Sequence, residues 1–333
     1  MIIRPKQQLR TNKIGLHIYF RVLCALVLFV LVSCTHTPSL TNKVISPVTT
    51  KQTHILLVNT NRSIARYQIA ETAFMKTLTG SSINAVDLGQ DQQPIDTLQD
   101  LLNKQHYDAV YCIGAKALGS IDYIDPDMPV IFSSVLNWRR FNAQKNYYGI
   151  ASEVAPEAQL TWFKYFFPKI KKIGVLYSSD NQKLLLDTST SAKKLAIQLV
   201  TKKVTRDSQL ASEAKALLAQ VDALWLISDP VVLASTQNAE MLFKVANKKR
   251  IPIFAYNSFF VDMGAALSIT ADRPTTGRQA ALMTKSVLNE AINEQSVQFP
   301  AGSSITLNLD KTEDYGVELN EDALDSVDII VNK

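Results

Sequence analysis

Short apolar runs alternate with amphipathic stretches through the first half of the chain beyond residue 53. The apolar runs have the length of buried strands, and the stretches between them repeat apolar residues at helical spacing. Buried strands that alternate with amphipathic helices are typical of a parallel α/β sheet. The predicted strands are residues 54–60, 83–88, 108–114 and 128–134, and the predicted helices between the first three are residues 63–78 and 95–104.

The same pattern recurs in the second half. The run KIGVLYSS at 172–179 corresponds to HILLVNT at 54–60, and DALWLIS at 222–228 repeats the Asp-Ala start of DAVYCIG at 108–114. IPIFAYN at 251–257 shares a proline in second place with the run at 128–134. Any two parallel sheets look alike to some degree, but the coincident Asp-Ala and Pro positions favour two equivalent α/β lobes.

Polar residues follow the predicted strands in both halves. Ligands of open parallel sheets bind at the carboxyl ends of the strands, where the next helices also direct their N-terminal amide groups. We therefore expect a shared cleft that favours a carboxylate or another anion. For the aspartates in this set a helix N-cap is the alternative role. The candidate ligand-binding residues are Asn59, Thr60, Ala115, Lys116, Ser133 and Ser134 in the first half, and Asp180, Asn181, Ser228, Asp229, Tyr256 and Asn257 in the second.

The first 33 residues predict export from the cytoplasm. They contain five basic residues and no acidic one, and the apolar run at 22–32 is shorter than the about 20 residues that span a bilayer. The sequence Leu31-Val32-Ser33-Cys34 resembles a bacterial lipobox, which implies that Cys34 is acylated and becomes the N-terminus of a lipoprotein. An uncleaved membrane anchor and an ordinary signal peptide are the alternatives. Residues 34–52, rich in Thr, Ser and Pro, predict a flexible tether.

The charge balance changes when this signal peptide is removed. Its loss leaves 30 basic residues against 30 acidic ones, so the mature chain is formally neutral. A neutral chain argues against nucleic acid as a partner. Cys112 is the only cysteine beyond Cys34 and lies in an apolar run, so we expect a buried strand thiol in an oxidising compartment.

The sequence lacks the familiar catalytic motifs. It contains no G-x-S-x-G, no P-loop, no H-E-x-x-H and no C-x-x-C. A hydrolase on an α/β fold would need a nucleophile with a base, and no such pair is evident. We therefore predict a protein that binds a small molecule, with no catalytic residue, no metal and no cofactor.

Three stretches resemble the ABC transporter substrate-binding proteins of the type I periplasmic-binding class. They are residues 107–121, 251–288 and 307–331, and the resemblance is to the subgroup that includes tryptophan- and tyrosine-binding lipoproteins. It implies two α/β lobes, the first of residues 53–149 and 271–295, the second of residues 150–270 and 296–333. It also implies three crossings between them, near 148–150, 269–271 and 297–299.

This chain departs from that family at two candidate site residues. Pro230 follows Asp229 where the family often has Asp-Asn, and Lys116 replaces a small or hydroxyl residue. Asp229 can still receive an ammonium group, whereas Lys116 favours an additional negative charge nearby.

Two functions remain open on this evidence. The first is a solute-binding lipoprotein that delivers a small polar molecule, such as an amino acid, to an ABC permease. The second is the same fold presenting its closed state to a membrane signalling receptor. Both place the protein in the bacterial cell envelope, facing the periplasm. Thr35, where Asp would signal inner-membrane retention, favours the outer membrane.

Overall fold

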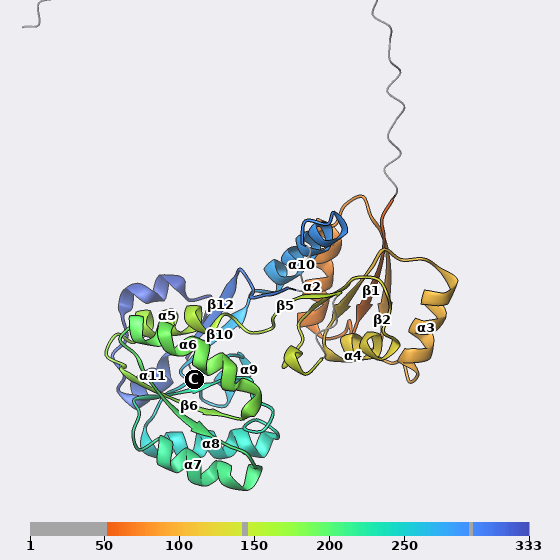
Figure 1. Ribbon diagram of the computed structural model, residues 1–333. Coiled ribbons are helices and arrows are strands. Elements are labelled where there is room, and N and C mark those ends of the chain that lie inside the picture. The colour runs from red at the N-terminus through yellow and green to blue at the C-terminus, as the bar shows by residue number, and fades with distance from the viewer. Residues whose placement is uncertain (1–51, 142–145, 293–295, 333) are drawn as a thin grey trace, which may run out of the picture. The chain divides into compact units, whose positions relative to one another are not determined.

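The computed structural model describes residues 52–141, 146–292 and 296–332, which form two β-sheets with helices packed against them (Figure 1). The predicted signal peptide, the acylation site at Cys34 and all but the last residue of the tether lie outside the described residues. No helix in the described part of the chain is long and apolar enough to cross a membrane.

The first sheet is parallel throughout. Its strand order is β11-β5-β4-β3-β1-β2, so β1 lies between β3 and β2, and five of its six residues are buried. Ile55 and Leu57 pack under α2 and α10, while Leu56 and Val58 pack with α3 and α4 on the opposite face, as the two-residue period of a strand requires. The elements are β1 His54–Asn59, α2 Ala65–Thr77, β2 Ser82–Asp87, α3 Pro94–Lys104, β3 Ala109–Ile113, α4 Ala115–Ile124, β4 Val130–Ser133, η1 Trp138–Arg140, β5 Tyr147–Ile150, α10 Arg273–Leu288 and β11 Val297–Gln298.

The second sheet has the order β13-β12-β10-β9-β8-β6-β7, and β12 is antiparallel to β10 while the other pairs are parallel. The aromatic run at 161–170 packs inward, because Phe163, Phe166 and Phe167 are fully buried. The elements are α5 Pro156–Phe166, β6 Lys172–Tyr177, η2 Ser179–Asn181, α6 Gln182–Lys194, β7 Gln198–Lys203, η3 Asp207–Gln209, α7 Leu210–Leu217, β8 Ala223–Leu226, α8 Thr236–Lys249, β9 Ile253–Ala255, α9 Phe259–Asp262, β10 Leu267–Ala271, β12 Ser303–Asn308, α11 Leu309–Tyr315, η4 Glu321–Ser326 and β13 Ile329–Val331.

The chain passes between the two sheets three times. It leaves the first sheet after β5, returns from β10 into α10, and leaves again between β11 and β12. These passages fall at the three segments where the sequence predicts crossings, while the lobe bounds given above stay a prediction.

Helix α10 returns to the first sheet and packs closely against α2, and the two helices lie side by side in Figure 1. Gly277 makes this approach possible, because a Cβ atom at that position would lie 2.2 Å from the carbonyl oxygen of Ala70. The packing brings the first turns of two helices, about two hundred residues apart in the sequence, to the same side of the sheet.

Candidate functional site

A cavity of about 100 Å³ is lined by residues that follow strands of both sheets. The strands contribute from their carboxyl ends, as expected for an open parallel sheet. Four of the twelve predicted ligand-binding residues line it, and the other lining residues come from α2, the loop after β4, the segment after β5 and the start of α10. The predicted residues are Ala115, Ser134, Tyr256 and Asn257, and the others are Arg66, Tyr67, Leu136, Ser152 and Arg273.

Two arginines make one wall of this cavity strongly positive. The guanidinium of Arg66 lies over the ring of Tyr67, 4.6 Å from its centre, and Arg66 Nη2 donates to the Tyr67 hydroxyl at 3.1 Å. Arg273 is half-buried, and its pKa is lowered by burial and by the positive charge of Arg66. Within the described residues no carboxylate forms an ion pair with either guanidinium. The wall is therefore suited to an anion.

Ser134 contributes an unpartnered hydroxyl. The residue is 7% exposed and adopts a left-handed conformation with φ of 58°, which is uncommon for a residue other than glycine. Its Oγ atom is buried and has no hydrogen-bond partner among the described residues. Buried polar atoms are nearly always paired, and backbone strain of this kind concentrates at binding sites. A ligand in the cavity would supply the missing partner.

Helix α4 begins at the same cavity with Ala115. Its N-cap, Gly114, has φ of 88° and offers no side chain, and the Ala117 amide donates to Thr60 Oγ1 at 3.1 Å. A Cβ at Gly114 would lie only 2.6 Å from Thr60 Oγ1, so the tight turn requires glycine. The positive end of the helix dipole thus adds to the charge of the arginines.

A second, much smaller cavity of about 20 Å³ shares Tyr256 with the first. Its lining includes the polar residues Glu153, Ser228 and Arg139 and apolar groups such as Trp225 and Phe299. Burial raises the pKa of the Glu153 carboxyl, against the opposing effect of its hydrogen bonds and of Arg139. Burial also raises the pKa of Tyr256 to about 12. This cavity therefore pairs an acidic group with an apolar surface.

One hydrogen bond connects the loop after β4 with the end of β8. Ser228 Oγ lies 3.2 Å from Asn137 Oδ1 and donates to it. Asn137, like Ser134, has a positive φ, of 52°. The polar groups after these two strands thus meet, although the strands belong to different sheets.

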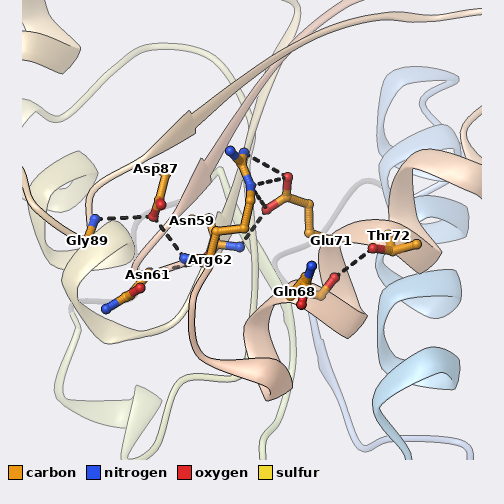
Figure 2. Close-up of polar contacts among 8 residues, drawn as sticks. All are labelled: Asn59, Asn61, Arg62, Gln68, Glu71, Thr72, Asp87 and Gly89. Carbon is orange, nitrogen blue, oxygen red and sulfur yellow. Dashed lines mark hydrogen bonds and ion pairs between the residues drawn. The ribbon is translucent and has the colours of Figure 1, made fainter.

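Asn59 and its neighbours hold the turn between β1 and α2 (Figure 2). Asn59 Nδ2 donates to Glu71 Oε2 at 2.6 Å, and Arg62 pairs with the same carboxylate at 2.8 Å. Asp87 Oδ1 accepts from the Arg62 amide at 2.9 Å and from the Gly89 amide at 3.1 Å. The network fixes the segment that leads directly into the first turn of α2.

Three more predicted residues of the first half bond to protein groups. Thr60 caps α4, as described above. The Ser133 hydroxyl lies 2.7 Å from the Tyr111 hydroxyl and is fully buried. Lys116 is exposed, and its ammonium group donates to the carbonyl oxygens of Leu88 and Asp91. The structure therefore does not bring these three side chains into the first cavity.

Asp229 organises the corresponding turns of the second sheet. Its carboxylate is 2% exposed and accepts four hydrogen bonds, from the Ser178 amide at 2.7 Å, Asn181 Nδ2 at 2.9 Å and the amides of Val231 and Val232 at 3.0 Å. No helix begins at Asp229, since α8 starts at Thr236 with Ser235 as its N-cap, so the carboxylate holds turns rather than capping a helix, the alternative role that the sequence left open.

The remaining predicted residues of the second half lie around the other cavities. Asn181 and Ser228 line the second cavity, whereas Asp180 is exposed beside a third that shares Arg139 and Phe299 with the second.

Sequence reasoning missed Arg66, Tyr67, Ser152, Glu153 and Arg273. The two arginines stand in the first turns of the helices that follow β1 and β10. A search that continued from each strand end into the first helical turn would have found both. Among the described residues there is no group of three or more His, Cys, Asp or Glu side chains that could hold a metal ion.

Residues 86–330 match a protein-family model described as ABC transporter substrate binding protein. The chain belongs to this family. Membership confirms the predicted family and the prediction of a binding protein rather than an enzyme.

Individual relatives agree with this assignment. The chain is 26% identical to the tyrosine-binding protein of Clostridioides difficile over 279 residues, which cover 78% of this chain and 76% of the relative. Among solved structures, a ligand-free, open substrate-binding protein with adhesive properties from Clostridium difficile has a TM-score of 0.63 at 20% identity, over 84% of this chain and 99% of the other. A domain from Streptococcus pneumonia in complex with L-Trp has a TM-score of 0.56 at 19% identity, over 84% of this chain and all of the other. These structural matches confirm the predicted fold class.

Proposed function

We propose that this chain is a lipid-anchored substrate-binding protein that captures a small polar molecule, of the amino-acid type, for an ABC importer. The observation that carries the proposal is the first cavity, whose lining comes from the carboxyl ends of strands in both sheets. A ligand that contacts both sheets at once binds more tightly when the two lobes are closed than when they are open. This difference in affinity shifts the protein towards the closed state.

The two adjoining cavities supply the groups that an amino acid requires. Arg66, Arg273 and Ser134 are suited to a carboxylate, and Glu153 is suited to an ammonium group. The apolar groups that line the second cavity, which include Trp225, suit the apolar part of a side chain. The ligands of two relatives, tyrosine and L-Trp, agree in chemistry with this arrangement.

The anchor is Cys34 in this proposal. The lipobox-like sequence Leu31–Cys34 and the basic, acid-free segment before it support acylation at this residue. The acylated protein would face the periplasm on a tether that ends where β1 begins. Thr35 after the acylated cysteine supports anchoring in the outer membrane. The expected partner is an ABC permease.

The test is ligand binding by the purified protein. We expect at least one of the common amino acids to raise the melting temperature in a saturable manner, and mass spectrometry of molecules released from the protein to find a compound of that type. Ser134→Ala and Asn257→Ala should each weaken binding about 5- to 10-fold, the equivalent of one neutral hydrogen bond. Glu240→Ala, at an exposed position on α8, is the matched control.

The outcome that contradicts the proposal is a released molecule without amine or carboxylate, together with no response to any amino acid. Unchanged ligand affinity in both variants would instead show that the binding site lies outside the first cavity.

A further inference from the structure

We infer that the ligand carries two negative charges, as a dicarboxylate or a phosphate monoester does, and that Arg66 and Arg273 bind these charges jointly. The inference rests on the proposed function, since it names the class of ligand for that same site.

The residues that line the first cavity give it a positive charge. Its lining residues include two arginines and, within the described part of the chain, no acidic residue. The carboxylate of a zwitterionic amino acid would neutralise only one of the two guanidinium groups. A ligand with two negative charges neutralises both. The zwitterion's ammonium group would also find its acidic partner, Glu153, only in the adjoining cavity.

The two arginines differ from their neighbours in forming no ion pair with an acidic side chain among the described residues. Arg62, four residues before Arg66, pairs with Glu71 at 2.8 Å, and Arg278, five residues after Arg273, lies 4.0 Å from Asp272. The charge of Asp272 also acts on Arg273, but without an ion pair it does not offset the other effects. The pKa of Arg273 is lowered by burial and by the positive charge of Arg66, against the smaller opposing effects of Tyr67 and Asp272.

The other polar groups of the cavity favour the same ligand. Ser134 offers its buried, unpartnered hydroxyl, and α4 directs its positive end to Ala115. Arginine presents several donors in a planar fork that matches the paired oxygen atoms of a carboxylate or phosphate. Two forks, a hydroxyl and a helix N-terminus provide enough donors for the oxygen atoms of a doubly charged group.

The test compares ligands that differ only in this charge. Glutamate with glutamine, phosphoserine with serine, and phosphotyrosine with tyrosine are titrated calorimetrically against the full chain, with succinate as a dicarboxylate that lacks the amine. The same titrations follow for Arg66→Gln and Arg273→Gln. Arg140→Gln is the matched control, because Arg140 is exposed and lies outside the cavities.

We expect the charged member of at least one pair to bind at least about 10-fold tighter than its neutral partner. Each cavity variant should reduce that preference about 10- to 100-fold, the range for a hydrogen bond to a charged group, while the control leaves it unchanged. Thermal melts of the free proteins should show that all three variants fold.

The possible results separate this inference from the proposed function. Neutral amino acids that bind as tightly as charged ones, with affinities unchanged in both cavity variants, overturn the inference and leave the proposed function standing. Binding of succinate without binding of any amino acid supports the inference and overturns the amino-acid assignment. Absence of binding by every compound, including succinate and the phosphorylated amino acids, overturns both.

Discussion

Replacement of Asp229 by alanine tests whether this residue binds ligand or holds the fold. Asp229 was a candidate ligand contact on sequence grounds, and a lost ligand contact would mainly reduce affinity. In the structure its carboxylate faces the protein and accepts four hydrogen bonds. Asp229→Ala should therefore mainly reduce stability.

The size of the expected loss in stability follows from the hydrogen-bond donors that lose the Asp229 carboxylate as their acceptor. The Ser178 amide and Asn181 Nδ2 are buried, and Asn181 keeps a second partner, the Ser228 carbonyl oxygen at 3.0 Å. The Val231 amide lies beside the exposed Pro230, where water can replace part of the interaction, whereas the Val232 amide is buried. Removal of one partner from a buried charged network typically lowers the free energy of unfolding by about 3–5 kcal/mol. At about 2–4 °C per kcal/mol, the melting temperature should fall by about 6–20 °C.

Thermal melts and ligand titrations of the same variant provide the assay. Asp222→Ala is the matched control, because Asp222 is exposed, lies before β8 rather than after it, and accepts only the amides of Lys171 and Lys172. Loss of such an exposed cap should lower the free energy of unfolding by about 1 kcal/mol. A variant at Asp229 that melts like the wild type but binds its ligand more than about 10-fold more weakly would refute the reasoning and return Asp229 to the site.

Three further predictions concern single residues. Cys112 is fully buried, and burial raises the pKa of its thiol, so peptide mass spectrometry should find it labelled by a thiol reagent only after denaturation. Cys34→Ser should release the protein from the membrane fraction, and full retention would favour an uncleaved helix. Gly114→Ala should destabilise the fold, because the alanine Cβ would clash with Thr60 and because the residue has a positive φ. At about 2 kcal/mol of strain, the melting temperature should fall by about 4 °C or more. A melting temperature like that of the wild type would show that the turn relaxes.

The central strands of both sheets could be predicted because burial on both faces leaves a continuous apolar run. HILLVN in β1 and AVYCI in β3 are examples, and their predicted bounds differ from the observed ones by one residue at most at each end. Strand β7 escaped prediction for the opposite reason. It lies at an edge, pairs only with β6, and its sequence QLVTKK has no buried face.

The candidate site was predicted only in part, because the strand-end rule gives a position along the chain but not the direction of a side chain. Asn59 and Asp229 stand at strand ends as expected, yet both turn inward and hold the adjoining turns. Ser134 and Asn257, at equivalent places, line the cavity instead. In these polar turns inward and outward positions do not alternate in a fixed pattern, so the sequence alone could not separate the two groups.

The pairing of Arg66 with Arg273 shows what a single sequence leaves undetermined. Each arginine alone reads as a solvated residue in the first turn of a helix, where a positive charge is unfavourable because of the helix dipole. They meet only because the chain returns to the first sheet after β10 and because Gly277 lets α10 approach α2. Two positive charges at two helix N-termini, brought together without an acidic partner among the described residues, oppose the stability of the free protein. A ligand anion removes that cost, so the same arrangement that weakens the empty cavity contributes to the affinity of the occupied one.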